Sequence, residues 1–560
     1  MTQIGNRKVN MNKRPALLTL VLLVVFTACA KPAAVPVQPV TGTPPGTDGY
    51  PWWNDTVFYE IFVRSFYDSD GDGIGDFNGI TAKLDYLNDG DPETTADLGV
   101  TGIWLMPINP SPSYHGYDVT DYYAVNPDYG TLDDFQNMLD EAHKRGIRVI
   151  IDMVLNHTSS QHPWFTGSWD PASPYHDWYV WSDTRPAYTG PWGQNVWHPS
   201  HGQYYYALFW NQMPDLNYAN PAVTAEMNNV IRFWLTDVGV DGFRLDAVKH
   251  LVEEGANMQN TGSTHTWLQQ FRTVYKGANP DALAVGEVWD DLNVIEGYVE
   301  GDELDLVFQF SLAEAFVYSA NAGNASAALD ELKLTCKLLP PLQYAPFLTN
   351  HDMNRVMSQL DGDAGKARVA ASMLLTAPGV PFIYYGEEIG LMGEKPDEDI
   401  RRPMQWSSEK YAGFSTAFPW RSVGPGWETN NAAAGTGDPA SLLSHYQALI
   451  RIRSQHAALR VGDTYTLRAN DSALYPILRV SGGEIVLVIV NLSDAPVSGY
   501  SLSLKESGVT PGTYRAFPIL GAADELPELT FAGDGSFTGY VPLPEIPAYA
   551  TLIVQLQIKK

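Results

Sequence analysis

Cysteine is almost absent from this chain. Its 560 residues include only two, Cys29 and Cys336. Because Cys29 falls in an N-terminal leader described below, an internal disulfide framework is excluded. We therefore expect the fold to be held by its apolar core, with Cys336 as a lone structural thiol.

Positive charge is also scarce. The chain has 35 Lys and Arg against 64 Asp and Glu, a formal net charge of −29 at pH 7. A surface this acidic repels phosphate backbones, so nucleic acid is excluded as a partner. Aromatic residues are plentiful, with 16 Trp and 30 Tyr. We expect most of them in the core, but their flat faces also suit sugar rings.

The sequence has no apolar run long enough for a membrane-spanning helix. The run from Ala16 to Phe26 is shorter than the roughly 20 residues that such a helix needs. It follows four basic residues and ends in Phe26-Thr27-Ala28-Cys29, which is typical of a secretory signal and resembles a bacterial lipobox. We predict a lipoprotein signal peptide over residues 1–29, with lipid on Cys29.

The mature protein would then be exported and anchored to a membrane through its N-terminal lipid only. Residues 30–49 are rich in Pro, Thr and Gly, which predicts a flexible linker between anchor and enzyme. The alternative is ordinary cleavage after Ala28 or Ala30, with release of a soluble protein.

After Tyr50, short apolar runs alternate with helical patterns, which favours an α/β fold with a parallel sheet. Eight such runs predict a (β/α)8 TIM barrel over residues 50–455. The predicted strands are Val57–Arg64, Gly102–Met106, Val149–Met153, Gly242–Leu245, Leu283–Gly286, Leu304–Phe308, Ala345–Thr349 and Phe382–Tyr385. The interval after the third strand is too long for one βα unit, so residues 157–215 are predicted to form a small inserted domain. Residues 460–560 are predicted to form a C-terminal antiparallel β-sandwich.

Four polar clusters fall where predicted strands end. They are Asp152-Met-Val-Leu-Asn156-His157, Arg244-Leu-Asp246, Glu287-Val-Trp and Asn350-His351-Asp352. Because the carboxyl ends of barrel strands meet at one face, we expect these side chains to converge. Strand-end salt bridges and turn caps would explain any one Asp, but they do not explain four clusters in order. Cleavage of a glycosidic bond needs two facing carboxyl groups, one ionised and one protonated.

The segments DMVLNH, GFRLDAVKH, GEVW and FLTNHD resemble, in this order, the signature regions of the α-amylase family of glycoside hydrolases. The resemblance extends from Trp52 to the C-terminus. It implies that Asp246 is the nucleophile of a retaining mechanism, Glu287 the general acid/base and Asp352 a third carboxylate that grips the sugar. It further implies substrate-binding roles for several other residues, namely Tyr117, His157, Arg244, Lys249, His250 and His351.

Three features indicate an endo-acting hydrolase of α-1,4-glucosidic bonds in starch, glycogen and maltodextrins. Met213-Pro-Asp-Leu-Asn217 resembles a fifth signature region in its intermediate form, Lys249-His250 resembles the pair beyond the cleavage point, and Tyr114 stands where exo-acting relatives carry Asp. The alternatives are a cyclomaltodextrinase or neopullulanase-like maltodextrin hydrolase, a transglycosylase, and a non-catalytic glucan-binding lipoprotein. The expected partner is an α-glucan, and we expect a monomer.

An acidic loop predicts a structural calcium ion. Residues 68–76 space their aspartates like the start of an EF-hand, with predicted ligands Asp68, Asp70, Asp72, the Ile74 carbonyl and Asp76. Gly79 at the twelfth position, where an EF-hand needs Glu, excludes a true EF-hand. A solvated Asp-Gly turn is the alternative. The family resemblance also implies a second calcium ion held by Asn156, Asp215 and the His250 carbonyl.

Overall fold

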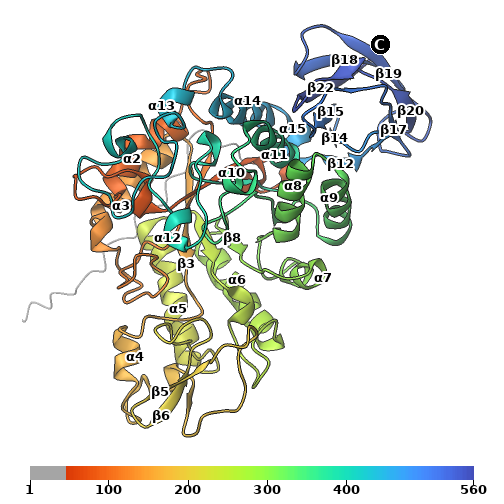
Figure 1. The fold of residues 1–560 in the computed structure, drawn as a ribbon. Coiled ribbons are helices and arrows are strands. Elements are labelled where there is room, and N and C mark those ends of the chain that lie inside the picture. Colours follow the sequence, from red (N-terminus) through yellow and green to blue (C-terminus); the bar gives the residue numbers. More distant parts are fainter. Residues whose placement is uncertain (1–45, 560) are drawn as a thin grey trace, which may run out of the picture. The chain divides into compact units, whose positions relative to one another are not determined.

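A computed structural model describes residues 46–559 (Figure 1). The predicted signal peptide with Cys29, and the linker up to residue 45, lie outside the described residues. Within the described range, no helix is both long and apolar enough to cross a membrane.

Eight parallel strands form the central sheet; in the order given next, the first seven pair one after another, and the last pairs with the first. They are β1 (Phe58–Ile61), β2 (Gly102–Leu105), β3 (Arg148–Met153), β7 (Gly242–Leu245), β8 (Leu283–Gly286), β9 (Leu306–Phe308), β10 (Tyr344–Ala345) and β11 (Phe382–Tyr384). Strand β11 returns to pair with β1. Backbone bonds from Val380 N to Tyr344 O (3.0 Å) and from Phe382 N to Pro346 O (2.9 Å) bridge the gap between β10 and β11. The predicted TIM barrel is confirmed.

Four predicted strands differ from the observed ones by one or two residues at one end, and two differ more. The run predicted as Val57–Arg64 ends early because helix α1 (Val63–Phe66) begins inside it. The strand predicted as Ala345–Thr349 is instead Tyr344–Ala345. In both places the apolar residues stay buried while the backbone leaves the sheet, and burial alone does not reveal that change.

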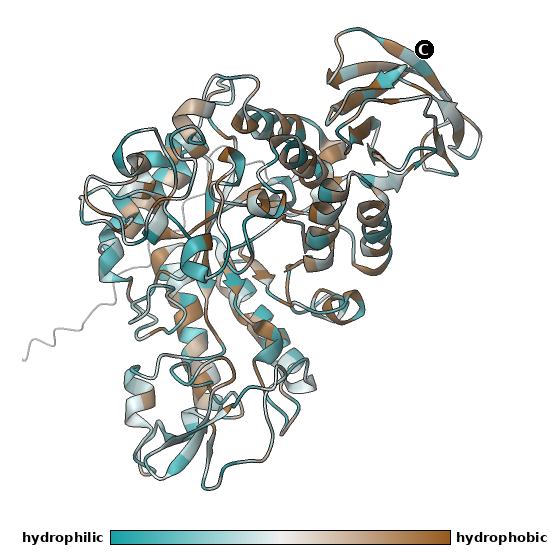
Figure 2. Ribbon diagram, viewed as in Figure 1, coloured by the Kyte–Doolittle hydropathy of each residue, from teal (hydrophilic) through white to brown (hydrophobic). Residues whose placement is uncertain are grey.

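The main helices are α2 (Phe77–Leu87), α3 (Leu132–Lys144), α5 (Pro221–Arg232), α6 (Gly262–Ala278), α8 (Phe310–Ala322), α9 (Ser326–Leu338), α11 (Ala364–Thr376) and α14 (Leu442–Gln455). Shorter ones are α4 (Pro163–Gly167), α7 (Leu292–Ile295), α10 (Val356–Gln359), α12 (Asp397–Ile400), α13 (Ala432–Gly435) and α15 (Ala457–Val461). Local sequence explains where helices begin: Thr131 and Asp134 form a capping box at α3. Figure 2 shows hydrophobic and hydrophilic bands alternating along the long helices, as expected when one face of each helix is buried.

A separate three-stranded antiparallel sheet lies between β3 and β7 in the chain, inside the range predicted for the insertion. It consists of β4 (Trp181–Ser182), β5 (Trp197–Ser200) and β6 (Gln203–Tyr206). An isolated backbone bridge joins His157 to Asp215, so the two ends of this segment are paired where it leaves and rejoins the barrel.

The last hundred residues form antiparallel sheets, as predicted. The largest has the order β12 (Asp463–Thr466), β14 (Leu474–Ser481), β15 (Glu484–Asn491), β22 (Thr551–Ile558), β18 (Gly512–Leu520), β19 (Leu526–Phe531). A three-stranded sheet contains β13 (Arg468–Ala469), β17 (Leu502–Leu504) and β20 (Phe537–Tyr540), and a two-stranded one contains β16 (Val497–Ser498) and β21 (Glu545–Ile546).

Strand β15 is apolar on both faces. Ile485, Leu487 and Ile489 belong to the core between the C-terminal sheets. The alternate residues Val486, Val488 and Val490 belong to the core cluster of the barrel. Because side chains alternate along a strand, β15 contributes to two cores at once. Buried Arg479 of β14 adds a hydrogen bond to the Thr376 carbonyl at the end of α11 (2.7 Å).

Candidate active site

The four predicted clusters converge at the carboxyl ends of the barrel strands. A pocket of about 310 Å³ contains five of the predicted residues, Tyr117, His157, Asp246, Glu287 and Asp352. It is also lined by Met213 of the fifth signature segment, and by residues that the sequence did not single out, His115, Phe209, Ala247, Asp397 and Arg401. The structure therefore brings these predicted side chains together at one pocket, as expected.

A larger cavity, of about 720 Å³, lies among segments that precede barrel strands, including Trp52, Asp281 and Gln343. Its carboxylate Asp305 is paired with Arg272 (3.0 Å) and Lys276 (3.1 Å). This cavity therefore does not bring together the several carboxyl groups from neighbouring strand ends that the smaller pocket contains.

One buried guanidinium joins three carboxyl groups from three strands. Arg244 on β7 donates from Nη1 to Asp152 Oδ1 (2.9 Å) and Asp246 Oδ1 (2.8 Å), and from Nη2 to Glu287 Oε2 (2.7 Å). Its side chain is fully buried. Because Asp246 and Glu287 are bound by neighbouring nitrogens of one planar group, their positions relative to each other are fixed.

Opposing effects act on the pKa of Asp246. Burial raises the pKa of Asp246 above its usual value, and the charge of Asp352 adds to that rise. Arg244 and His351 lower the pKa but do not reverse the shift. Arg244 therefore favours the ionised form of Asp246 against the cost of its desolvation.

Glu287 behaves as predicted. Burial raises its pKa, and the negative charges of Asp246 and Asp352 raise it further, against the opposing effect of Arg244. The N–H of Ala247 also donates to Glu287 Oε2 (3.0 Å). Ala247 has a left-handed backbone (φ 47°), a conformation that costs energy for a residue with a side chain and is here tied to the site.

Asp352 is held by two cations. His351 Nε2 lies 3.0 Å from its Oδ2, and Arg401 Nη2 donates to its Oδ1 (2.9 Å). Burial would raise the pKa of Asp352, but His351 and Arg401 outweigh it and hold the pKa well below the usual range. Of the three predicted catalytic carboxyls, this one is the most firmly ionised.

The charge of His351 depends on Glu60, which the sequence did not indicate. His351 Nδ1 lies 2.6 Å from Glu60 Oε1 in the middle of β1. Burial lowers the pKa of His351, yet Asp352 and Glu60 together raise it to about 10. Tyr117 stacks on the same ring at 5.6 Å and 16°, and its hydroxyl lies 2.7 Å from His351 Nε2.

His157 faces the pocket in its neutral form. Burial lowers its pKa to about 3. Its Nε2 is buried and has no hydrogen-bond partner among the described residues. That nitrogen is therefore free to bond a hydroxyl group of a ligand.

Lys249 and His250 do not line the pocket. Lys249 Nζ donates to the Trp289 carbonyl (2.7 Å) and lies 3.2 Å from Asp290 Oδ2. His250 Nδ1 lies 2.8 Å from the Met258 carbonyl, and burial lowers its pKa to about 4. Both sit on the turn η6 (Val248–His250) that follows the nucleophile strand.

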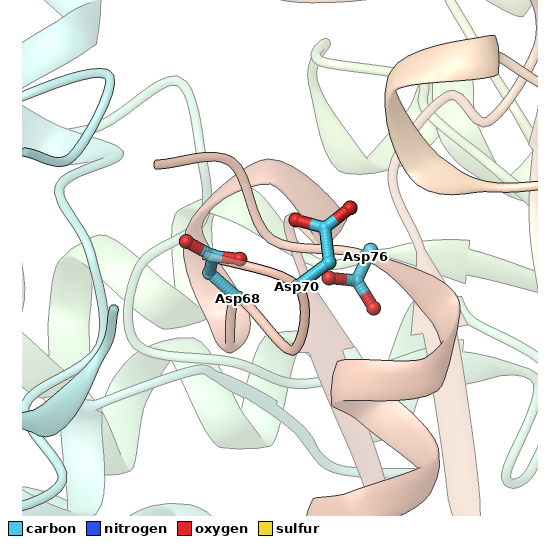
Figure 3. A group of neighbouring side chains, drawn as sticks. All are labelled: Asp68, Asp70 and Asp76. Atoms are coloured by element: carbon cyan, nitrogen blue, oxygen red, sulfur yellow. The ribbon is translucent and has the colours of Figure 1, made fainter. Parts of the chain in front are cut away.

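The acidic loop brings together three of its predicted calcium ligands. Carboxylate oxygens of Asp68, Asp70 and Asp76 lie within 4.8 Å of one another, and Figure 3 shows their carboxylate groups gathered at one loop. Oxygen-only ligands of this charge fit a hard cation. Asp72 is not part of the group: its carboxylate accepts the N–H of Ile74 (2.7 Å). Burial and the charges of its neighbours raise the pKa of Asp70, a repulsion that a cation would relieve.

At the second predicted calcium site, Asn156 Nδ2 donates to Asp215 Oδ2 (2.9 Å). Burial raises the pKa of Asp215 to about 7. Glu253, which the sequence did not indicate, lies close enough to interact with Asp215. Asn156 Oδ1 and Glu253 Oε1 are buried without a partner within residues 46–559, so unpaired oxygens of the kind calcium binds are present.

Comparisons with known proteins agree with this geometry. Residues 60–462 match the family described as alpha amylase, catalytic domain. Alpha-amylase 3 of Dictyoglomus thermophilum is 41% identical over 453 residues, 79% of this chain and 86% of that protein. The trehalose synthase/amylase TreS of Mycobacterium tuberculosis is 35% identical over 568 residues, 89% of this chain and 92% of that protein. The crystal structure of alpha-amylase from H. orenii superposes with a TM-score of 0.78 at 41% identity, covering 90% of this chain and 99% of that one.

The pairing of Glu60 with His351 gives a testable result. Replacing Glu60 by Gln removes a negative charge beside the ring, so the pKa of His351 should fall from about 10 and the ring should lose its proton at lower pH. The ring carbons of labelled histidine, followed by NMR against pH, report this directly. Glu484→Gln is the matched control, because it breaks a different His–Glu pair, that of His456 (2.6 Å), and should leave His351 unchanged. An unaltered His351 titration in Glu60→Gln would contradict the assignment.

Proposed function

The chain belongs to the α-amylase family of glycoside hydrolases, and we propose that it hydrolyses internal α-1,4-glucosidic bonds of starch, glycogen and maltodextrins with retention of configuration. One observation carries this proposal: a single buried guanidinium holds Asp246 and Glu287 against the same pocket. A retaining mechanism needs the nucleophile and the acid close together, and the shared guanidinium keeps these two carboxyl groups close.

In the first step, Asp246 attacks the anomeric carbon while Glu287 gives its proton to the departing glycosidic oxygen. The carbon–oxygen bond breaks, and an ester between Asp246 and the sugar forms. In the second step, Glu287 takes a proton from water, the water oxygen attacks the same carbon, and Asp246 is released. The raised pKa of Glu287 suits the acid role, since the group must be protonated when substrate arrives.

Asp352 and His157 would contact the sugar rather than react with it. The low pKa of Asp352 keeps a negative charge beside the ring that becomes positive in the transition state. The unpartnered Nε2 of His157 and the face of Tyr117 suit a hydroxyl group and a sugar ring respectively.

Endo-acting specificity rests on Tyr114. It stacks on Trp420 at 5.3 Å and 23°, which supplies an aromatic surface where exo-acting relatives carry Asp. The 41% identity to an alpha-amylase over most of both chains supports the same choice. A non-catalytic glucan-binding protein is disfavoured because all three carboxyls are present in the pocket.

A transglycosylase or isomerase is the second candidate. The observation that favours it is the similarity to a trehalose synthase/amylase, which extends over 89% of this chain. Such an enzyme would use the same ester and differ only in what attacks it. A maltodextrin hydrolase of the cyclomaltodextrinase or neopullulanase type remains the third.

The products distinguish these candidates. Purified protein is incubated with soluble starch, maltose and β-cyclodextrin, and the products are resolved over time. We expect rapid loss of starch viscosity and a spread of α-anomeric maltodextrins, with Glu287→Gln about 10³-fold slower because the proton donor is lost. Conversion of maltose to trehalose ahead of starch cleavage would favour the isomerase, and preference for cyclodextrin the maltodextrin hydrolase. Binding of starch with no cleavage would overturn the enzyme proposal.

We also propose a structural calcium ion at Asp68, Asp70 and Asp76, with the Ile74 carbonyl as a further ligand. Removing calcium with a chelator should lower the melting temperature, and Asp70→Asn should abolish that dependence. At a calcium concentration about 100 times the dissociation constant, binding would stabilise the fold by about 3 kcal/mol. Asp91→Asn, in another exposed loop, is the control and should respond to the chelator like wild type. Equal melting temperatures of the wild-type protein with and without chelator would refute this site.

Export and lipid attachment at Cys29 are proposed from the leader sequence. The full chain expressed in bacteria should incorporate labelled fatty acid and partition into detergent. Cys29→Ser should do neither, whereas Cys336→Ser, the exchange of the other cysteine, should behave like wild type. Fatty-acid labelling that persists in Cys29→Ser, or a soluble wild-type protein, would favour ordinary cleavage and secretion.

A further inference from the structure

Arg355 is a buried cation behind the active site. It follows Asp352 by three residues but is not among the residues that line the pocket. Its guanidinium forms no ion pair within residues 46–559: Nε donates to the Ile400 carbonyl (2.8 Å) and Nη1 to the Tyr385 carbonyl. Nη2 is buried and has no hydrogen-bond partner in the same range. A buried charge without a counter-ion costs free energy, so we expect the guanidinium to perform a task that an apolar side chain could not.

The Ile400 carbonyl belongs to the peptide group that precedes Arg401. Two side chains bind this carbonyl, because the Tyr384 hydroxyl also donates to it (3.2 Å). The guanidinium carbon of Arg355 lies 4.1 Å from the centre of the Tyr384 ring and 4.5 Å from that of the Tyr385 ring. Since both tyrosines stand at the end of barrel strand β11, Arg355 and Tyr384 together tie the peptide before Arg401 to the barrel.

The main chain of Arg355 holds the same connection at a second point. Its N–H donates to the Gly393 carbonyl (2.9 Å). A Cβ atom added to Gly393 would lie 2.3 Å from the Asp399 carbonyl oxygen, so the stretch around Gly393 is in direct backbone contact with the stretch before Arg401. Arg355 therefore bonds to both stretches of the segment after β11, and this leaves the segment little room to shift.

These contacts close a ring around Asp352. Along the chain Asp352 leads to Arg355, and Arg355 bonds the Ile400 carbonyl. The next residue, Arg401, returns to the start: its Nε donates to the His351 carbonyl (2.9 Å) and its Nη2 to Asp352 Oδ1 (2.9 Å). A change at Arg355 would therefore alter the position of Arg401 relative to Asp352 without removing any group from the pocket.

We propose that Arg355 is a positioning residue for cleavage of the glycosidic bond: it fixes Arg401 against Asp352 and so keeps this carboxylate aligned on the sugar. This inference rests on the proposed retaining function. Asp352 would act mainly on the transition state, in which the sugar ring becomes positive. An error in its position should therefore reduce turnover more than it weakens binding of the ground state. Arg355 touches no reacting atom, so its effect must pass through Arg401.

The kinetics of Arg355→Lys are measured first. Lysine keeps the charge but loses the planar fork that reaches two carbonyl groups at once. We expect kcat for maltohexaose to fall about 10- to 100-fold, as when a reacting group is misplaced by a change outside the reacting centre. KM should change by less than about twofold, because the groups that bind the ground state stay in the pocket.

Binding gives a readout that needs no turnover. Two ligands of equal length are titrated by calorimetry into proteins that also carry Glu287→Gln, so that neither ligand is consumed. Maltotriose is neutral, whereas 4-O-α-maltosyl-1-deoxynojirimycin ends in an imino sugar that carries a positive charge, as the transition state does. Arg355→Lys should weaken binding of the imino sugar by about the factor lost in kcat and leave that of maltotriose nearly unchanged.

Arg453→Lys is the matched control. Arg453 is equally buried, its Nε also has no partner within residues 46–559, and its guanidinium donates only to backbone carbonyls, those of Leu375 (3.1 Å), Ala377 (2.8 Å) and Gly379 (2.6 Å). Because these carbonyls lie outside the pocket, Arg453→Lys should lower the melting temperature and leave both kcat and the affinity for the imino sugar unchanged. All rates are measured below the temperature at which either variant begins to unfold.

A double-mutant cycle tests whether Arg355 acts through Arg401. Arg401→Gln removes the cation from Asp352, so adding Arg355→Lys to it should lower kcat by less than about twofold more. Fully additive losses would contradict the proposed route.

The remaining outcomes are as clear. An unchanged kcat in folded Arg355→Lys, or equal losses of affinity for the two ligands, would overturn the role of Arg355. If Arg355→Lys does not fold, Tyr384→Phe decides the question, because it removes only the other hydrogen bond to the Ile400 carbonyl. We then expect a lower kcat at an unchanged KM, and an unchanged kcat would refute the proposal. A wild-type protein that cleaves no glucan would defeat the proposed function, whereas the two titrations would still decide whether Arg355 positions the site.

Discussion

The buried guanidinium of Arg244 is the interaction on which the site depends. Parallel strands end at one face, so Asp152, Asp246 and Glu287 from three neighbouring strands are forced close together. Three carboxyl groups out of water would repel one another, and each would be costly to ionise. One planar cation placed among them supplies hydrogen bonds to all three and fixes their geometry. Arg244 therefore compensates the repulsion that arises because the barrel strands bring these three carboxyl groups together.

Further charged residues surround Arg244 and the carboxyl groups that it binds. The acidic members of the cluster are Glu60, Asp152, Asp246, Glu287 and Asp352, and the basic members are Arg244, His351 and Arg401. Carboxyl groups outnumber cations, so the pocket stays negative even when one acid holds a proton. A negative field favours the positive charge that a sugar ring acquires as its bond breaks. It also favours the protonated form of Glu287, because the negative charges of Asp246 and Asp352 raise its pKa.

The sequence was sufficient for the barrel, the order of its strands and the convergence of Asp246, Glu287 and Asp352, because apolar runs ending in polar residues mark strand ends. It was not sufficient for Glu60 and Arg401. Glu60 is a charged residue inside a buried strand, and Arg401 lies in a long connection after the last strand, where charged residues are common and distance along the chain reveals nothing about contact. The rise that burial causes in the pKa of Asp246 was not visible either, because a motif does not reveal desolvation.

Strand β15 has one face in the barrel core and the other between the C-terminal sheets. Both cores can therefore be completed only after the C-terminal strands have been synthesised. Its hydrogen-bonding partner β22 ends at residue 558, so neither face of the shared sheet is complete until nearly all of these residues have been synthesised. Until β22 has paired with β15, the valines of β15 that pack against the barrel lie on an incomplete sheet. A nascent chain in this state exposes apolar surface, so it must be kept unfolded or be shielded from aggregation. For the export proposed above, in which the chain crosses a membrane before it folds, that delay is an advantage.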